Sequence, residues 1–269
     1  MADLARVTLV LDTLAESRHG LTVTELAVRT GLPRSTVHRV LQCLERELYV
    51  VRAHEPDQSG YVLGPALLKF GMNSHLRLLA ATRPDLVVLA RELHERVELA
   101  VFSGREVVVV DQIAAPARLR GVTQVGKSFS LHASCIGKAL LARLPDARVT
   151  ELLPPRLDRF TPATITDRDV LLAELTAVRR TGVAVDLEEH DQGISAVATT
   201  RPGPGGTWQA VAVVMPSHAF AGKFAAVVRG LRRVNAEIDV AAALDLRRAC
   251  LLSREPGRTG SAGPAATAP

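Results

Sequence analysis

The stretch TGLPRSTVHRVL, residues 30–41, joins a glycine turn, a proline and the start of a helix. Gly31 suits a left-handed helix cap, and Pro33 suits the first turn of the next helix, where its missing N–H has no partner to lose. From residue 37 onward, apolar side chains recur at helical spacing and predict a buried stripe of Val37, Val40, Leu41, Leu44 and Leu48. The stretch therefore predicts a turn followed by an amphipathic helix.

The outward face of this helix is polar and basic in its first two turns. We predict that it contacts DNA through Arg34, Ser35, Thr36, His38, Arg39 and Gln42. Arginine can bridge the O6 and N7 atoms of guanine, while hydroxyl and imidazole groups can bond phosphates or bases. Residues 26–44 contain three arginines and no acid, so Arg29 joins the predicted set. The alternative is an ordinary small helical domain with a solvated polar face.

Two shorter helical patterns precede this helix. Leu4–Ser17 repeats apolar residues at helical spacing, and His19-Gly20 ends the run. Thr22 and Glu25 then have the form of a capping box, in which each side chain bonds the other residue's backbone N–H. Helix, glycine turn and helix is the order of a helix-turn-helix, whose second helix presents its N-terminal residues to base edges.

Two short strands are predicted after this helix, at Tyr49–Arg52 and Gly60–Leu63, around the polar turn HEPDQS. Such a hairpin is the wing of a winged helix-turn-helix, and Arg52 is a further predicted DNA contact. Residues 1–64 are therefore assigned to a DNA-binding domain. Bulk charge does not carry this assignment, because these residues contain seven arginines, no lysine and eight acids. The assignment depends instead on the local distribution of charge, because residues 26–44 contain arginines and no acid.

Composition argues against several other classes of protein. The chain of 269 residues is 47% hydrophobic and 23% charged, which is typical of globular domains rather than of disorder. It has no run of about 18 apolar residues that would predict a membrane span. Its cysteines, Cys43, Cys135 and Cys250, form neither a disulfide framework nor a zinc-ligand spacing. These features predict a cytoplasmic protein without a membrane partner.

Residues 65–82, PALLKFGMNSHLRLLAAT, predict a linker helix with more apolar side chains than one buried face needs. These side chains are Leu67, Leu68, Phe70, Met72, Leu76, Leu78 and Leu79. Burial against a second copy of the chain would explain them, so we predict that this helix forms a dimer. Arg83-Pro84 is expected to open a separate helix that ends at about Val97.

Residues 83–250 combine runs of strands with intervening helices. Strands are predicted at ELAVFSG (98–104), REVVVVDQI (105–113), LRGVTQVG (119–126), VAVDL (183–187), ISAVATTR (194–201) and TWQAVAVVM (207–215), with GPGG (203–206) as a hairpin turn. Helices are predicted at IGKALLARL (136–144), Thr166–Arg180 and about Ala219–Arg248. This order indicates an α+β domain with an antiparallel sheet. Residues 251–269 have no core-forming side chains after Leu252 and predict a disordered tail.

Three segments together resemble the IclR family of bacterial transcription regulators. They are GYVLGPALLKFG (60–71), LHASCIGKALLA (131–142) and GVAVDLEEHDQGISAVA (182–198), and the resemblance extends in order from about residue 4 to residue 248. It implies a winged helix-turn-helix, a linker helix and a C-terminal effector-binding domain with a GAF-like fold. It also implies homodimers, or dimers of dimers, on pseudo-palindromic operators of double-stranded DNA.

The resemblance further implies positions for a ligand site. Members that bind small polar acids place a Gly-Ala pair, an aspartate, a later cysteine and two serines there; the matching residues here are Cys135, Ile136, Asp186, Ala196, Ala212 and Val214. Only Asp186 is polar, so we expect a larger and less polar pocket floor. A glyoxylate- or pyruvate-sized acid would fit it poorly. We predict a more apolar or aromatic effector, oriented by Asp186 and by amides at the N-terminus of the 135–144 helix.

One position in the DNA-binding part departs from the family pattern. The family commonly has glycine where this chain has Leu48 at the end of the recognition helix. A left-handed cap is costly for leucine. We therefore expect the exit from this helix to differ.

Two site chemistries remain open as alternatives. The segment Asp186–Asp191 contains enough carboxylates and imidazole for a metal site, although a contiguous acidic loop is usually solvated or paired with arginine. An extended backbone would send Asp186, Glu188 and His190 to one side and Glu189 and Asp191 to the other. Separately, Cys135 near His132 could be an activated thiol at a helix N-terminus, although no third orienting group is evident.

Three functions compete on these observations: a ligand-responsive DNA-binding regulator, an enzyme on a GAF-like domain, and a structural oligomer. The chain has no nucleophile elbow, P-loop or dinucleotide-binding glycine motif, which disfavours an enzyme. The capping box, the Gly31 turn and the acid-free arginine face favour the regulator. We therefore predict no catalytic residue, no metal and no cofactor.

Overall fold

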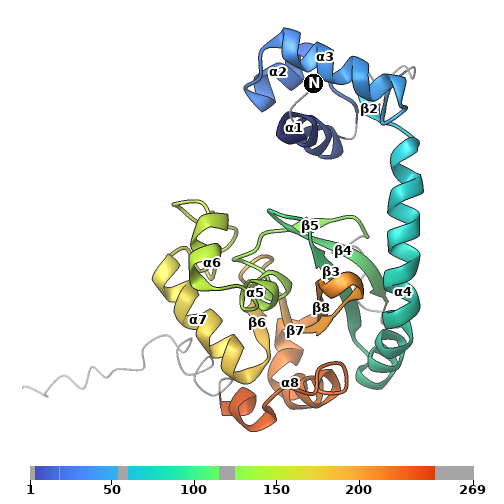
Figure 1. The fold of residues 1–269 in the computed structure, drawn as a ribbon. Coiled ribbons are helices and arrows are strands. Elements are labelled where there is room, and N and C mark those ends of the chain that lie inside the picture. Colours follow the sequence, from blue (N-terminus) through green and yellow to red (C-terminus); the bar gives the residue numbers. More distant parts are fainter. Residues whose placement is uncertain (1–3, 18, 54–59, 115–124, 246–269) are drawn as a thin grey trace, which may run out of the picture. The chain divides into compact units, whose positions relative to one another are not determined.

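The computed structural model describes residues 4–17, 19–53, 60–114 and 125–245 (Figure 1). The chain divides into two compact units, Met1–Arg77 and Leu78–Pro269, and each is described by itself. The predicted wing turn 54–59, most of the predicted strand 119–126 and the predicted tail 251–269 lie outside the described residues. Within the described part of the chain, no helix is long and apolar enough to cross a membrane.

The first unit is a helical domain with a small antiparallel sheet. Its elements are α1 (Leu4–Ala15), α2 (Val23–Thr30), α3 (Arg34–Arg46), β1 (Val50–Arg52) and β2 (Tyr61–Leu63). β1 and β2 pair with Val51 opposite Val62. The core contains Val10 and Leu14 from α1, Leu26 from α2, and Val37, Val40, Leu41 and Leu44 from α3. The predicted helix-turn-helix and its wing strands are confirmed.

The turn between α2 and α3 forms for local reasons. The Thr22 N–H donates to the Glu25 carboxylate at 2.8 Å, and the Glu25 N–H donates to Thr22 Oγ1 at 3.3 Å, so the capping box forms as predicted. Gly31 ends α2 in the left-handed conformation, with φ of 67°, which glycine adopts without steric cost. Pro33 lies just before the first residue of α3 rather than within its first turn.

The exit from α3 does not differ as the sequence suggested. Leu48 adopts the left-handed conformation itself, with φ of 57°. Backbone bonds offset the strain, because the Tyr49 N–H donates to the Leu44 carbonyl and the Ala66 N–H donates to the Leu48 carbonyl. Gly64 packs so closely that a Cβ there would lie 2.1 Å from the Leu48 oxygen. Leu48 is also 54% exposed, so its assignment to the buried stripe was wrong.

One helix, α4 (Ala66–Leu93), replaces the two helices predicted at 65–82 and 83–97. Pro84 lies inside it, where proline removes one hydrogen bond to the preceding turn. Residues Leu86 and Leu89 are buried in the core of the second unit, and this packing offsets the lost bond. Arg96, assigned to a helix by the sequence, instead begins a strand.

The second unit is built on a six-stranded sheet. Its strands are β3 (Arg96–Phe102), β4 (Val107–Ile113), β5 (Ser128–Phe129), β6 (Ala184–Leu187), β7 (Ile194–Pro202) and β8 (Trp208–Pro216). They lie in the order β5-β4-β3-β8-β7-β6, and every neighbouring pair is antiparallel. The 3₁₀ turn Pro204–Gly206 joins β7 to β8, as the GPGG motif predicted. The α+β class with an antiparallel sheet is confirmed.

The two faces of this sheet bury side chains of different size. On β8, every second residue from Ala210 to Val214 joins a core with α5 (Cys135–Leu141), α6 (Asp146–Leu152) and α7 (Arg168–Thr181). The residues between them, from Val211 to Met215, join a core with α4 and α8 (Ser217–Leu231). Strand alternation produces this division. The face toward α5 therefore carries the smaller side chains.

The C-terminal helix predicted at about Ala219–Arg248 is interrupted. α8 ends at Leu231, and residues 240–245 become helical again after a series of turns. In these turns the Asn235 side chain bonds to β7 and to the N–H two residues ahead, and the Asp239 carboxylate accepts the N–H three residues ahead. Such local bonds compete with continuation of the helix.

Candidate DNA-binding face and ligand pocket

The first turns of α3 present the predicted DNA-contacting side chains to solvent. Arg34, Ser35, His38, Arg39 and Gln42 are exposed, and Thr36 is half-buried. Within the described part of the chain, Arg34, His38 and Arg39 make no side-chain hydrogen bond or ion pair. α3 also lacks a side-chain cap, which leaves its first N–H groups available. The face therefore offers cations and amides to a polyanion.

The two remaining predicted contacts lie on neighbouring elements. Arg29 is exposed in the last turn of α2. Arg52 is exposed on β1, where its Nε donates to Glu45 Oε1 at 3.2 Å and its guanidinium lies 5.4 Å from the centre of the Tyr61 ring. Tyr61 and then Glu45 raise the pKa of Arg52. Because the pair with Glu45 is open to solvent, Arg52 can exchange that partner for a phosphate.

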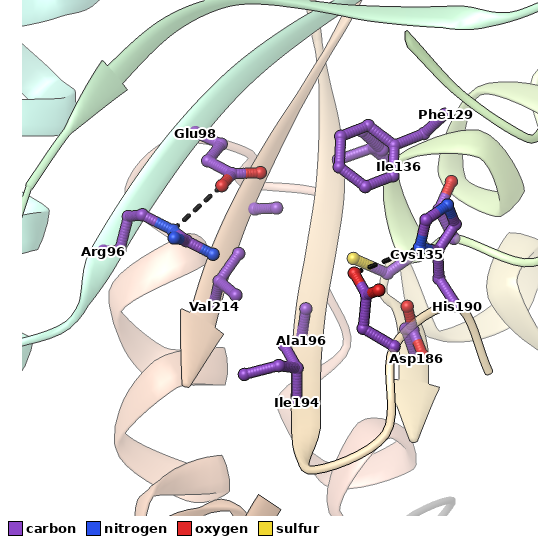
Figure 2. Close-up of a pocket in the computed structure, with 13 residues that line it drawn as sticks. Arg96, Glu98, Phe129, Cys135, Ile136, Asp186, His190, Ile194, Ala196 and Val214 are labelled. Atoms are coloured by element: carbon purple, nitrogen blue, oxygen red, sulfur yellow. Dashed lines mark hydrogen bonds and ion pairs between the residues drawn. The ribbon is translucent and has the colours of Figure 1, made fainter. Parts of the chain in front are cut away.

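All the residues that the resemblance placed in a ligand site line one pocket of the second unit (Figure 2). Cys135 and Ile136 come from α5, Asp186 from β6, Ala196 from β7, and Ala212 and Val214 from β8. Arg96, Glu98, Phe129, Ser134, His190, Asp191 and Ile194 complete the lining. The empty space between them, open solvent included, is about 400 Å³.

The register of the sheet explains how residues of four strands meet in this pocket. Asp186 lies opposite Ala196, Ala196 lies opposite Val214, and Val214 lies opposite Arg96. Directly opposed residues project from the same face of a sheet. We call this row of Asp186, Ala196, Val214 and Arg96 the pocket floor. It has a carboxyl group at one end, a guanidinium at the other and apolar side chains between them.

Arg96 and Glu98 were not identified from the sequence. Their side chains are 1% and 4% exposed, and Arg96 Nε lies 2.9 Å from Glu98 Oε1. The pocket floor is therefore apolar at Ala196 and Val214 but charged at the end that β3 forms, which was not expected from the sequence. A signal was present, since the two charged residues alternate with apolar ones in RVELAVF. This strand pattern was overlooked because the residues up to about Val97 were assigned to a helix.

Asp186 forms the other end of the floor. Its Oδ1 accepts the Glu189 N–H at 2.8 Å. Burial and the neighbouring Glu189 raise the pKa of Asp186 to about 7, although Lys138 opposes the shift. Lys138 is fully buried, and its Nζ donates to Glu189 at 2.7 Å and to Glu174. The charges next to Asp186 thus form a network of paired groups.

The segment after β6 does not keep the alternation expected of an extended chain. Glu188 has a left-handed backbone, with φ of 61°. His190 and Asp191, which strict alternation placed on opposite sides, consequently both line the pocket with Asp186. Among the described residues, no group of three His, Cys, Asp or Glu side chains is placed to hold a metal ion.

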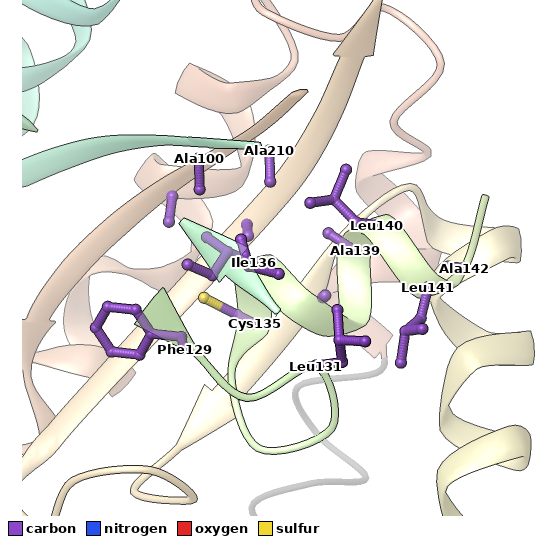
Figure 3. Close-up of a cluster of buried hydrophobic side chains, with 14 of the residues drawn as sticks. Ala100, Phe129, Leu131, Cys135, Ile136, Ala139, Leu140, Leu141, Ala142 and Ala210 are labelled. Carbon is purple, nitrogen blue, oxygen red and sulfur yellow. The ribbon is translucent and has the colours of Figure 1, made fainter. Parts of the chain in front are cut away.

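Cys135 lies in the core between α5 and the sheet, near Phe129 and Ile136 (Figure 3). Burial, with Asp186 and Glu98 nearby, raises the pKa of its thiol well above the ordinary value. An activated thiol requires the opposite shift. Burial therefore disfavours the thiolate form of Cys135, and the helix containing it ends at Leu141 rather than at residue 144. In addition, the Ser134 hydroxyl accepts one of the first N–H groups of this short helix.

Aromatic rings form one wall of the pocket. Phe129 and His190 line it, with ring centroids 4.8 Å apart. Phe160 stacks on His190 at 5.0 Å. Rings arranged in this way favour contact with a planar, apolar ligand.

A winged helix-turn-helix followed by a domain with a small-molecule pocket defines the class of ligand-responsive transcription regulators. The model of the IclR helix-turn-helix domain matches residues 4–54, and that of the bacterial transcriptional regulator IclR C-terminal domain matches residues 71–240. The chain belongs to the IclR family of bacterial transcriptional regulators. The family consists of DNA-binding regulators with an effector-binding domain, so the alternative of an enzyme on a GAF-like domain is rejected.

Two regulators are similar along most of their length. HTH-type transcriptional regulator Rv1719 of Mycobacterium tuberculosis is 39% identical over 236 residues, 88% of this chain and 90% of that protein. HTH-type transcriptional regulator TtgV of Pseudomonas putida is 37% identical over 214 residues, 80% of this chain and 81% of that protein. A solved IclR homolog from Microbacterium hydrocarbonoxydans, complexed with 4-hydroxybenzoate, is 25% identical with a TM-score of 0.66, over 91% of this chain and 99% of that one.

Proposed function

We propose that the protein is a cytoplasmic, sequence-specific DNA-binding regulator whose operator affinity changes when a small molecule occupies the pocket. One observation carries the proposal: α3 exposes Arg34 and Arg39, which have no partner among the described residues. A recognition helix places such arginines against guanine edges in the major groove. Arg29 and Arg52, on neighbouring elements, are suited to fixing the helix on the phosphates.

The effector is proposed to be more apolar or aromatic than a simple short-chain acid. The middle of the pocket floor is Ala196 and Val214, and the adjacent wall is Phe129 and His190. These groups bury apolar surface and leave few polar contacts for a very small acid. The 4-hydroxybenzoate bound to the Microbacterium homolog supports an aromatic effector in this family.

The first half of α4 is the proposed dimer interface. Leu68, Phe70, Met72 and Leu76 are each more than half exposed. Large exposed apolar side chains gathered on one helix favour an interaction site, and a second copy of the chain would cover them. Two copies would present two α3 helices to the half-sites of a pseudo-palindromic operator.

Sedimentation of the full-length protein tests this interface. We expect a dimer or larger oligomer at micromolar concentration, and we expect Leu76→Glu to shift it toward monomer. Val28→Glu is the matched control, because Val28 is an exposed apolar residue on α2 rather than on α4. A monomeric wild-type protein would refute the interface.

Footprinting on DNA upstream of the protein's own gene, with and without a metabolite panel, tests the regulatory function. We expect two protected half-sites separated by about one helical turn or a multiple of it. Binding should weaken steeply with salt, because arginine contacts release counterions. At least one aromatic compound should change the protection. No protected site would refute DNA recognition, and tight binding of short-chain acids without binding of aromatic compounds would refute the effector class.

A further inference from the structure

We propose that the effector is a hydroxylated aromatic carboxylate, whose carboxylate pairs with Arg96 and whose hydroxyl bonds Asp186. The inference rests on the proposed function only in taking this pocket as the effector site. It assigns ligand specificity to Arg96, a position that the family resemblance did not supply. Its basis is the pocket floor, which ends in Arg96 on β3 and in Asp186 on β6.

Arg96 has donor groups that no described residue uses. The residue is 1% exposed and lines the pocket, and its Nη1 and Nη2 are buried without a hydrogen-bond acceptor. Glu98 forms an ion pair with the Nε end of the guanidinium. Buried donors without acceptors cost stability, so an acceptor from the ligand would relieve this cost. Figure 2 shows Arg96 and Glu98 on one side of the pocket, across from Asp186 and His190.

A carboxylate fits these donors better than a neutral acceptor does. Its two oxygens match the planar fork of a guanidinium, and charge-assisted hydrogen bonds are about twice as strong as neutral ones. The same unit already contains one buried cation held by two carboxylates, because Lys138 donates to both Glu174 and Glu189. Arg96 has Glu98 as its first carboxylate partner, and the ligand would supply the second.

The length of the floor selects a ligand of aromatic size. Neighbouring strands lie about 4.8 Å apart, so three such spacings separate the Asp186 and Arg96 backbones by about 14 Å. The arginine side chain takes up part of this span. The rest lies over Ala196 and Val214, which are small, and beside the ring of Phe129. An aromatic ring with substituents at opposite ends can reach both ends of the floor, whereas a two- or three-carbon acid reaches only one.

A hydroxyl group suits the Asp186 end of the floor. Asp186 Oδ1 accepts the Glu189 N–H, and its Oδ2 makes no hydrogen bond to a described residue. Because burial raises the pKa of Asp186 to about 7, both protonation states are populated at neutral pH. A hydroxyl can donate to the carboxylate and can accept from the acid. An ammonium could only donate, and an ether could only accept.

Calorimetric titration of the full-length protein tests the inference with three probes: 4-hydroxybenzoate, its neutral analogue 4-hydroxybenzamide, and benzoate. We expect 4-hydroxybenzoate to bind at least about 10-fold more tightly than the amide, which is the effect of one hydrogen bond to a charged group. It should also bind more tightly than benzoate, which has no hydroxyl for Asp186.

Two variants and a control locate the preference for the acid over the amide. Arg96→Met removes the guanidinium, and Arg96→Met/Glu98→Leu also removes the buried carboxylate that forms an ion pair with it. The double variant, checked for folding by circular dichroism, should bind acid and amide equally. Arg201→Met is the matched control, because Arg201 pairs with Asp85 and does not line the pocket. This control should keep the preference.

The inference is overturned if 4-hydroxybenzamide binds the wild type as tightly as 4-hydroxybenzoate. It is overturned as well if neither 4-hydroxybenzoate nor benzoate binds. It is also overturned if the preference persists in the folded double variant. Titrations with operator DNA separate this result from the proposed function. Binding of the acid through Arg96 without any change in operator affinity would support the ligand assignment and refute the regulatory role. An operator response to neutral aromatic compounds alone would support the regulatory role and refute the ligand assignment.

Discussion

The proposed DNA-binding face and the pocket hold arginine in opposite environments. On α3, Arg34 and Arg39 are exposed and have no partner among the described residues. In the pocket, Arg96 is 1% exposed and lies against Glu98. An exposed guanidinium is already solvated and attracts a polyanion through charge, whereas a buried one requires a partner of matching geometry. Under the proposals made above, the exposed arginines supply affinity for DNA and the buried arginine supplies selectivity for a ligand.

The largest effect should come from removing a buried charge, and it should act on folding. Lys138→Met leaves Glu174 and Glu189 without their shared cation, and we expect the free energy of unfolding of the second unit to fall by about 3–5 kcal/mol. Urea unfolding followed through Trp208, the one tryptophan of the chain, measures this. Arg233→Met, the control, removes an exposed ion pair and should change little. Equal losses of unfolding free energy in Lys138→Met and Arg233→Met would contradict the distinction between buried and exposed charges.

Removing an exposed charge should instead act on DNA affinity alone. We expect Arg39→Ala to weaken operator binding by about 1–3 kcal/mol per copy, about 5- to 150-fold, while ligand affinity and unfolding stay unchanged. Fluorescence anisotropy on an operator fragment measures the loss. Arg46→Ala is the matched control, because Arg46 is exposed at the opposite end of α3. Full operator affinity in Arg39→Ala would show that this face of α3 is not the reader.

The backbone that positions α3 can be tested separately from its charges. Gly31 has φ of 67°, and a Cβ there would meet no atom within 4 Å, so Gly31→Ala adds only conformational strain. We expect a loss of about 1–2 kcal/mol in the stability of the first unit, measured by thermal unfolding. Gly222→Ala in α8 has equal space and no positive φ, and it should be neutral or stabilising. If Gly31→Ala and Gly222→Ala change stability equally, the left-handed conformation of Gly31 does not determine the stability of the first unit.

The smallest expected effect is a pH dependence that originates in the pocket. The pKa of Asp186 is about 7 in the folded protein against an ordinary value of 3.8, so folding favours the protonated acid. Its contribution to stability is complete below about pH 3.8 and is lost as the pH rises through 7, at about 1 kcal/mol between pH 6 and 8. Urea midpoints of the Trp208 transition should fall over this range. Asp186→Asn should reduce that fall, and an unchanged slope would contradict the shift.

The exposed face of α3 could be predicted because local rules determine it. A capping box, a left-handed glycine and a stripe at helical spacing define which side of α3 is buried, and therefore which side is exposed. The exception, Leu48, has a strained φ that its Gly64 and Ala66 neighbours support. That support comes from residues well beyond the helix, so the local pattern gave no sign of it.

The pocket could be predicted only in part because it depends on strand register. The resemblance placed Asp186, Ala196 and Val214, and the sheet brings them together. Arg96 joins them only because β3 pairs with β8 in one particular register, which the sequence does not specify. The proline at residue 84 also suggested a helix boundary that tertiary packing overrode.

The most direct test is whether the two regions are coupled. Operator affinity is measured with and without a saturating concentration of the tightest-binding aromatic compound, and the affinity for that compound is measured with and without saturating operator. Linkage requires the two ratios to be equal, and we predict a ratio of about 5 to 150 in both directions. A ratio of one in both measurements, with DNA and compound both bound, would contradict the claim that the pocket controls the DNA-binding face.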